Sequence, residues 1–242
     1  MGGWKLGNTR DGAQADYVLI PDAEANLAPI PDALSDEDVL LCPDILSTGI
    51  SGAERAGVRL GDTVAVFAQG PNGLCATAGA RLLGATRIFV VDRNAHRLEI
   101  ARGLGADVLV DATKSDPVAT IREQTGGRGV DVAIEALGTP GTLESCLRVV
   151  RPAGTVSSLG VYDKTPTLPV DAFAAGLGDR HLLTTLCPGG KDRMRRVMAL
   201  VAAHRLDFRP FVTHRYALAD ILEAYELFAA QRDGVLKVAI TP

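Results

Sequence analysis

A turn of small residues with the spacing of a phosphate-binding motif lies in the first half of this sequence. Ala68, Gly70 and Gly73 match the pattern Gly-x-Gly-x-x-Gly, with Ala at the first position. In this motif the first residue makes a tight turn, the second lets the backbone approach a pyrophosphate, and the third packs a helix closely on a strand. The start of that helix then presents free N–H groups to the phosphates. The turn, which also holds Pro71 and Asn72, therefore predicts a dinucleotide-binding site.

An acidic residue follows the turn at the distance that this motif expects. Asp92 lies about twenty residues after the turn, at the end of an apolar run. A carboxylate there accepts hydrogen bonds from the adenosine ribose and repels a 2′-phosphate, which favours NAD over NADP. The neighbouring Arg93 and Arg97 suit a 2′-phosphate, so NADP stays an alternative. The other interpretation is an ordinary turn, with Asp92 as a helix cap. The succession of strand, turn, helix, second strand and acidic residue argues against it.

The motif lies within a regular alternation of strands and helices. Apolar runs predict strands at residues 63–67, 88–91, 108–110, 130–134 and 155–159. Four helical patterns lie between them. The first ends near Leu83, the second spans 94–104, the third begins at Pro117, and the fourth spans 142–150. Continuous apolar strands separated by helices indicate a parallel sheet covered on both faces. The expected fold class is therefore α/β, a doubly wound sheet of the Rossmann type.

The two ends of the chain differ from this central part. Residues 1–43 hold four prolines and no long helical pattern, which predicts loops and short strands. Residues 189–242 predict a basic helix at 191–204, a second helix at 218–230 and a closing strand at 236–240. Neither end is large enough to bury a core alone. Either the two ends pack together, or part of a domain lies outside the chain.

The composition is that of a globular protein with an ordinary core. Apolar residues make up 47% and charged residues 22%, and the net charge of −4 favours neither nucleic acid nor a membrane as a partner. No apolar run reaches membrane-spanning length, and the first residues lack a signal-peptide pattern. The cysteines form no Cys-x-x-Cys pair, which fits a reducing cytoplasm; they are Cys42, Cys75, Cys146 and Cys187. The last three are expected to be small core residues.

Six segments distributed over the chain form a pattern that is specific only when they are taken together. They lie at residues 42–49, 61–66, 84–107, 126–131, 151–155 and 236–238. Together they resemble the medium-chain dehydrogenase/reductase family, specifically its zinc-dependent alcohol dehydrogenases. The run Leu-Cys-Pro-Gly-Gly at 186–190 is similar to the bacterial secondary-alcohol dehydrogenases in particular. The resemblance implies hydride transfer between a small primary or secondary alcohol, or its ketone or aldehyde, and NAD, in a homodimer or homotetramer.

The same resemblance implies a division into domains. Residues 1–43 would end a GroES-like catalytic domain, 44–188 would form the NAD-binding Rossmann domain, and 189–242 would return to the catalytic domain. The segment 3–5 would fall well inside a family member, so much of the catalytic domain would have no counterpart here. The resemblance thus predicts an N-terminally shortened chain.

The resemblance also implies a catalytic zinc, for which Asp44 would be one ligand. Such a zinc acts as a Lewis acid on the alcohol oxygen and keeps about three protein ligands. The Cys and His that complete the set in the family have no counterpart here. Cys42 could join Asp44, because Pro43 favours an extended chain; an inert buried Cys42 and a turn or cap role for Asp44 are the alternatives. The histidines show no ligand spacing: His96, His181, His204 and His214.

Other family roles transfer to single positions of this sequence. Thr48 would face the nicotinamide, Asn94 and Arg97 would flank the adenosine ribose, and Lys237 would reach the pyrophosphate. Five residues after two strands would line the adenosine and nicotinamide clefts: Leu137, Gly138, Leu159, Gly160 and Val161. For each residue the alternative is an ordinary loop or solvent-facing position.

Three functions stay open from the sequence. The first is an NAD- and zinc-dependent alcohol dehydrogenase. The second is an NAD-binding protein without catalysis, since two of the three expected zinc ligands are missing. The third is a zinc-free quinone reductase type that reduces enones from NAD(P)H, against which Asp44 and the run at 186–190 argue.

Overall fold

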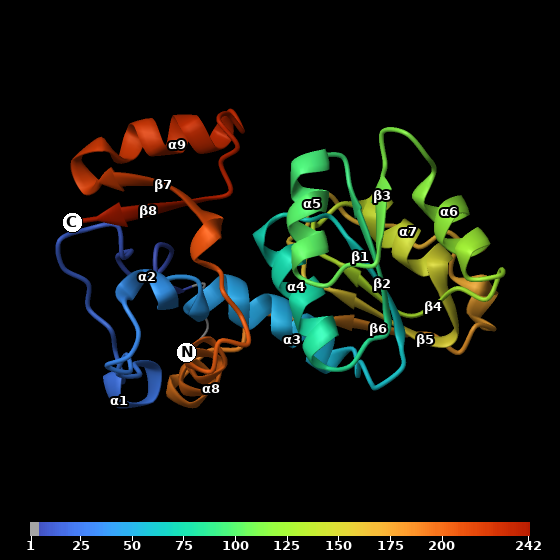
Figure 1. Ribbon diagram of the computed structural model, residues 1–242, viewed down its shortest axis with the longest axis horizontal. Helices are drawn as coiled ribbons and strands as arrows, with labels where there is room; N and C mark the ends of the chain where they lie inside the picture. The colour runs from blue at the N-terminus through green and yellow to red at the C-terminus, as the bar shows by residue number, and fades with distance from the viewer. Residues whose placement is uncertain (1–4) are drawn as a thin grey trace. The chain divides into compact units, whose positions relative to one another are not determined.

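The alternating central part of the chain folds into one parallel sheet (Figure 1). The computed structural model describes residues 5–242; residues 1–4, which include Gly3 and Trp4 of the resemblance, lie outside the described part. The strand order is β3-β2-β1-β4-β5-β6, and every neighbouring pair is parallel. The strands are β1 (Thr63–Phe67), β2 (Arg87–Asp92), β3 (Val108–Asp111), β4 (Val130–Glu135), β5 (Val150–Ser158) and β6 (His181–Thr184). The predicted doubly wound sheet of the Rossmann type is confirmed.

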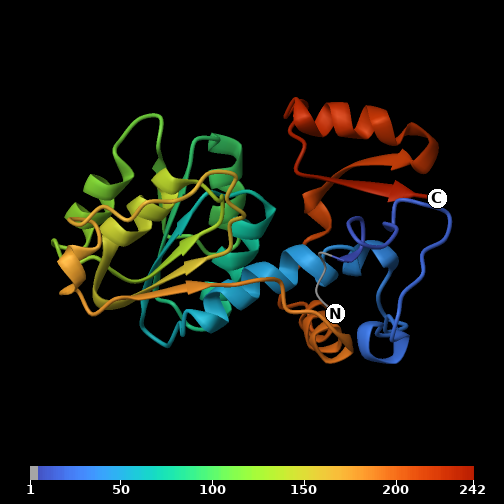
Figure 2. The same ribbon diagram turned by 180° about the vertical axis from the view of Figure 1, so that it is seen from behind.

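Helices cover both faces of this sheet, as parallel strands with apolar residues on both sides require. α4 packs beside α5 on one face, and α6 packs beside α7 on the other (Figures 1 and 2). These helices are α4 (Pro71–Leu82), α5 (Ala95–Gly103), α6 (Pro117–Gln124) and α7 (Pro140–Val149). Between the two layers the central strand β1 is buried from its second residue on, as Val64, Ala65 and Val66 illustrate.

Three elements of the sheet differ from their predictions. β5 begins at Val150 rather than at Thr155, because an irregular register against β4 extends it. α7 begins at Pro140 rather than at Thr142, because the Thr139 side chain caps the helix. The edge strand β6, drawn in orange in Figure 2, has no counterpart among the predicted strands. It is short and mostly exposed, so it lacks the apolar run that marks the buried strands.

The two ends of the chain form a compact unit of their own. It comprises residues 1–47 and 187–242, whereas residues 48–186 form the unit that contains the sheet. In the first unit, α9 packs on the parallel strands β7 and β8, and α8 packs against α1, α2 and the π-helix η2. Its elements are α1 (Ala23–Asn26), α2 (Asp36–Val39), η2 (Cys42–Leu46), α8 (Lys191–Ala202), η4 (Arg209–Phe211), β7 (Val212–Ala217), η5 (Leu218–Asp220), α9 (Ile221–Ala229) and β8 (Lys237–Thr241). Of the two arrangements expected for the chain ends, their packing together is observed.

Two further elements complete the described chain. α3 (Ser47–Arg55) leads into the second unit, and the 3-10 helix η3 (Ala174–Gly176) lies between β5 and β6. Within the second unit, α3 lies close against α4, since an added Cβ at Gly79 would lie 3.1 Å from the Cα of Ile50.

Most of the described residues before position 43 form loops, as expected, but the expected short strands are replaced by the two short helices α1 and α2 and an isolated bridge between Leu6 and Arg10. α2 begins with a capping box: Asp38 N donates to Ser35 Oγ at 3.3 Å, and Ser35 N donates to Asp38 Oδ2 at 2.8 Å. Local side-chain bonds of this kind start a single helical turn, which is too short to produce an apolar periodicity. The prediction of strands here is wrong for that reason.

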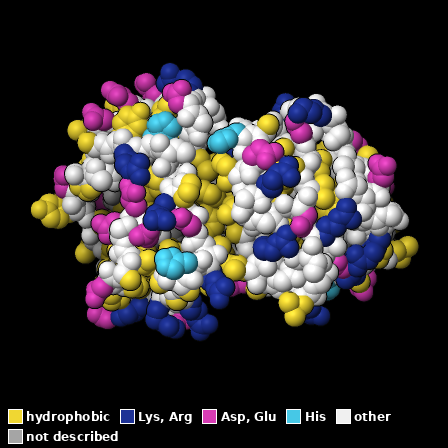
Figure 3. All heavy atoms as spheres, in the orientation of Figure 1, with side chains coloured by type: hydrophobic (Ala, Val, Ile, Leu, Met, Phe, Trp, Pro, Cys, Tyr) yellow, Lys and Arg dark blue, Asp and Glu magenta, His cyan; other side chains and the backbone are white. Residues whose placement is uncertain are grey.

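Both signs of charge are spread over the surface of the second unit. On the face shown in Figure 3, its Lys and Arg side chains are interspersed with Asp and Glu. This distribution follows the scattered charges of the sequence. Within residues 5–242, no helix combines the length and the apolar character needed to cross a bilayer.

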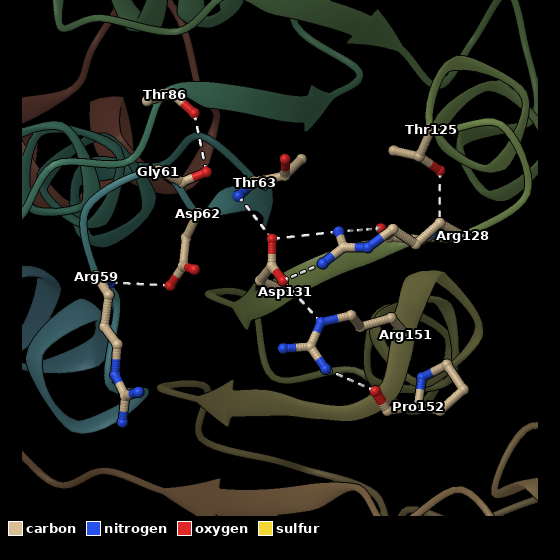
Figure 4. A network of polar contacts seen from close by, with 11 residues as sticks. Arg59, Gly61, Asp62, Thr63, Thr86, Thr125, Arg128, Asp131, Arg151 and Pro152 are labelled. Carbon is tan, nitrogen blue, oxygen red and sulfur yellow. Dashed lines mark hydrogen bonds and ion pairs between the residues drawn. The ribbon is translucent and has the colours of Figure 1, made fainter.

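A charged network joins the amino-terminal ends of three strands (Figure 4). Asp131 Oδ2 accepts a hydrogen bond from the Thr63 N–H at 2.9 Å. Asp131 Oδ1 accepts from Arg128 Nη2 at 2.5 Å and from Arg151 Nε at 2.7 Å. Burial alone would raise the pKa of Asp131, but these hydrogen bonds outweigh it and lower the pKa from 3.8 to about 2. The network therefore binds β1, β4 and β5 together at the edge opposite the predicted turn.

Replacing Asp131 with Asn should lower the free energy of unfolding at pH 7 by about 2 kcal/mol. The folded pKa lies below the unfolded value of 3.8, so the carboxylate stabilises the fold above that value and loses this effect as the pH falls towards about 2. In urea unfolding, the difference in the free energy of unfolding between wild type and variant should therefore shrink from pH 6 to pH 3. Glu99→Gln, which breaks an exposed pair with Arg102, is the control and should change stability by less than about 0.5 kcal/mol.

Candidate functional site

The predicted turn connects β1 to α4 at the carboxyl edge of the sheet. Its first residue, Ala68, has a φ of 70°, in the left-handed region that favours glycine. The Ala68 N–H donates to the Val91 carbonyl at 2.8 Å, which fixes the turn against the end of β2. The alanine that departs from the motif thus adopts the conformation for which the motif uses glycine.

The start of α4 offers unused N–H groups beside open space. Gly70 is the N-cap and has no side chain that could cap the helix, and Pro71 has no N–H. The N–H groups of Asn72 and Gly73 lie in the first turn, where a helix supplies no acceptor. A Cβ added to Gly70 would meet no heavy atom within 4 Å, so a ligand can approach the backbone there. These residues fit an anionic group such as a pyrophosphate.

Gly73 allows the turn and the helix to pack against each other. A Cβ at this position would overlap the Ala68 carbonyl oxygen and lie 3.5 Å from the Cβ of Ala136. Because the overlapping atom belongs to the backbone, no side-chain rotation could relieve it. Gly73 therefore performs the packing role that the motif assigns to its third position.

Asp92 is held directly beside the turn. Its Oδ2 accepts a hydrogen bond from the Gln69 N–H at 2.5 Å, and its Oδ1 accepts from the Asn94 N–H at 2.8 Å. Gln69 is itself buried, and its Oε1 accepts from Thr77 Oγ1 at 3.0 Å. The carboxylate is partly exposed, so the two bonds orient it without covering it. The structure brings together the two parts of the predicted motif.

The residues after Asp92 begin α5. The Asn94 side chain is the N-cap and accepts from the His96 and Arg97 N–H groups at 2.9 and 3.3 Å. Arg93 is exposed and Arg97 is partly exposed. The role of these three residues beside the ribose stays a prediction.

The predicted cleft residues lie in the loops after β4 and β5. Leu137 is 55% exposed and Val161 is exposed, whereas Gly138 and Leu159 are buried and Gly160 is partly buried. The two loops touch, because a Cβ on Gly160 would overlap the backbone of Gly138. Their contact with a cofactor stays a prediction.

Glu135 ends β4, is completely buried, and was not among the residues predicted for the site. Its carboxylate contacts the loops after both β4 and β5. An acidic residue directly after the apolar run 132–134 was the signal available in the sequence.

The segment around Asp44 differs from its prediction. Pro43 lies at the start of the π-helix η2, where its missing N–H costs nothing, so the expected extended chain is wrong. Cys42 is 2% exposed, and burial raises the pKa of its thiol to about 11. Asp44 is exposed. A buried thiol and an exposed carboxylate do not share one face, so the structure favours the inert Cys42.

The described residues do not bring together a complete set of zinc ligands. Within residues 5–242, no three side chains of His, Cys, Asp or Glu come together as metal ligands. Cys187, expected in the core, is only partly buried, and its thiol lies 3.4 Å from the Pro43 carbonyl oxygen. Cys75 and Cys146 are buried as expected, and no described cysteine forms a disulfide. The role of Asp44 as a zinc ligand stays a prediction.

Two further predicted residues lie in different units. Thr48 is buried in α3 of the second unit, and Lys237 begins β8 of the first unit and is partly buried. Their roles toward a nicotinamide and a pyrophosphate stay predictions.

Comparison with known proteins identifies relatives over almost the whole chain. Residues 71–203 match the family described as zinc-binding dehydrogenase. An alcohol dehydrogenase of Cupriavidus necator is 62% identical over 240 residues, which cover 99% of this chain and 66% of the relative. An NADP-dependent isopropanol dehydrogenase of Thermoanaerobacter brockii is 36% identical over 243 residues, covering 99% of this chain and 69% of the relative.

A solved structure extends the likeness to three dimensions. The alcohol dehydrogenase from Thermus sp. ATN1 superposes with a TM-score of 0.86 at 35% identity, over 96% of this chain and 66% of that one. This chain thus spans about two thirds of the length of these proteins. The matched region begins at the N-terminus of α4 and so includes much of the site described above. By sequence and by fold, the chain belongs to the zinc-binding dehydrogenase family.

Proposed function

We propose that this chain binds NAD at the carboxyl edge of its sheet. The pyrophosphate would lie at the start of α4, and the adenosine ribose would bind Asp92. The hydrogen bond of 2.5 Å from the Gln69 N–H to Asp92 carries this proposal, because it holds the carboxylate beside Gly70. Pyrophosphate and ribose are adjacent in a dinucleotide, so their two sites must be adjacent as well.

The charge of Asp92 supports NAD rather than NADP. A partly exposed carboxylate repels the 2′-phosphate that distinguishes NADP, and its two oxygens accept hydrogen bonds from ribose hydroxyls. The Thermoanaerobacter relative is named NADP-dependent, so family membership alone does not decide the preference. The local chemistry at the end of β2 is the stronger argument.

The reaction that we propose is hydride transfer between a small alcohol and NAD. The hydride would leave the carbon that bears the hydroxyl group and join the nicotinamide ring, while the hydroxyl proton is released. The products are a ketone or aldehyde and NADH. The names of the Cupriavidus and Thermus relatives support the alcohol as substrate. The homodimer or homotetramer stays a prediction.

NAD binding without catalysis is the second candidate. It is favoured by the residues of the described chain, within which no three potential ligands gather for a zinc ion. The zinc-free quinone reductase alternative fits the same observation, but Asp44 and the run at 186–190 argue against it.

Calorimetric titration of the chain with NAD⁺ and NADP⁺ tests the binding proposal. NAD⁺ should bind at least about tenfold more tightly than NADP⁺, because the 2′-phosphate of NADP⁺ makes one unfavourable charge contact with Asp92. If neither nucleotide is retained at millimolar concentration, the proposal is wrong. Oxidation of a secondary alcohol, followed by NADH absorbance with and without added Zn²⁺, separates the two candidates. Turnover supports the dehydrogenase, and binding without turnover supports the second candidate.

A further inference from the structure

Glu135 occupies the centre of the carboxyl edge of the sheet. It ends β4, where it pairs with Phe67 of β1 on one side and Ser158 of β5 on the other. Its exposed fraction is 0%. A carboxylate in such a place is unfavourable unless donors satisfy its oxygens. Both oxygens of Glu135 therefore need hydrogen-bond donors from the surrounding residues.

One oxygen of Glu135 holds the loop that follows β4. Oε1 accepts hydrogen bonds from the N–H groups of Leu137 and Gly138, both at 2.8 Å. It also accepts from Thr142 Oγ1 at 2.7 Å, at the start of α7. These bonds fix the backbone direction between β4 and α7.

The other oxygen holds the loop that follows β5. Oε2 accepts from Tyr162 Oη at 2.9 Å and lies 3.3 Å from Ser158 Oγ. The two hydroxyl groups are 2.8 Å apart. Burial and the nearby carboxylate raise the pKa of Tyr162, although its bond to Ser158 opposes this. The phenol therefore keeps its proton and remains a donor to Glu135.

The carboxylate thus joins two loops that meet backbone to backbone. A Cβ on Gly138 would overlap the Val161 carbonyl, and one on Gly160 would overlap the N and Cα of Gly138. Contacts this close leave little freedom for either loop while the shared carboxylate is in place. Apolar side chains could fill the same volume, but they could not orient the two backbone N–H groups.

These loops lie on the opposite side of the strand-order reversal from Asp92. The order changes direction between β1 and β4, and a dinucleotide bound there extends over both sides. With the adenosine half at β2, the nicotinamide half extends over the ends of β4 and β5. We propose that Glu135 is a positioning residue for the nicotinamide half, acting through the loops that it joins; this inference rests on the proposed function.

Titration with two nucleotides tests this assignment. Glu135→Leu should weaken NADH binding at least about tenfold and leave ADP, which lacks the nicotinamide half, within about threefold of wild type. Glu135→Gln should retain NADH within about threefold, because its amide oxygen can still accept from Leu137 and Gly138. The amide nitrogen of this variant takes the place of Oε2, and the hydroxyl groups of Ser158 and Tyr162 can rotate to accept from it.

Tyr162→Phe is the milder variant in case Glu135→Leu does not fold. It removes one donor to Oε2, leaves the Oε1 bonds in place, and should weaken NADH about fivefold, with ADP binding within about twofold of wild type. Hydrogen exchange gives a readout that is independent of nucleotide: the Leu137 and Gly138 amides should exchange slowly in wild type and faster in Glu135→Leu.

The outcomes separate this inference from the proposed function. If wild type does not bind NADH, the proposed function fails. If wild type binds NADH but Glu135→Leu and Tyr162→Phe lose NADH and ADP equally, or lose neither, the assignment of Glu135 alone is overturned. A selective loss of NADH, restored in Glu135→Gln, supports it.

Discussion

Replacing Gly73 with Ala should lower the free energy of unfolding by about 3 kcal/mol and weaken NADH binding by about 10- to 100-fold. The added methyl group would overlap the Ala68 carbonyl oxygen, so α4 must move away from the turn. A displaced helix no longer aims the Asn72 and Gly73 N–H groups at the pyrophosphate, which removes charge-assisted hydrogen bonds. Urea unfolding followed by circular dichroism measures the first effect, and calorimetry measures the second.

Ala68→Gly is the matched control on the other side of the same contact. It removes a methyl group rather than adding one, at a residue with a φ of 70°. Glycine adopts this conformation without steric cost, so stability should stay level or rise by about 1 kcal/mol, with NADH binding retained. Equal stability of Gly73→Ala and wild type would show that the close packing of turn and helix is not required.

Replacing Asp92 with Gly should change the ratio of NAD⁺ to NADP⁺ affinity by about 100-fold. The variant loses the acceptors for the ribose hydroxyl groups, which weakens NAD⁺ binding. It also loses the negative charge that repels a 2′-phosphate, which strengthens NADP⁺ binding. Calorimetric titration of both nucleotides measures the change directly.

Asp111→Gly is the matched control for that experiment. Asp111 ends β3 and lies in register with Asp92, so its removal changes the net charge equally on the neighbouring strand. Its carboxylate is engaged with Thr113 and Lys114. The control should leave the nucleotide preference within about threefold of wild type. If both variants shift the preference alike, the general charge of the edge is responsible, and Asp92 has no specific role.

The central sheet could be predicted because its strands are buried on both faces. Val64 to Phe67 form an uninterrupted apolar run between turn residues, and the structure begins and ends β1 at the predicted residues. The turn and Asp92 were predicted together because their chemistry depends on residue types at fixed spacing. For β1 and the turn, the pattern of neighbouring residues in the sequence and the fold of the sheet agree.

The remaining features depend on contacts that a linear pattern does not contain. β6 becomes a strand by pairing with β5, although its side chains are mostly exposed. Pro43 suggests an extended chain, yet the same residue is equally suited to the first turn of a helix. Glu135 directly follows an apolar run, but only the fold brings Tyr162 to its carboxylate. Such residues become recognisable when the donors that surround them are known.

The division of the chain into one continuous and one discontinuous unit has a consequence for biosynthesis. Residues 48–186 contain every strand of the large sheet, so this unit can fold as soon as they have left the ribosome. The first unit combines residues 1–47 with residues 187–242, which are translated only after the whole second unit. The described residues 5–47 therefore stay without these partners while residues 48–186 are translated, and chaperones have an opportunity to bind them during that interval.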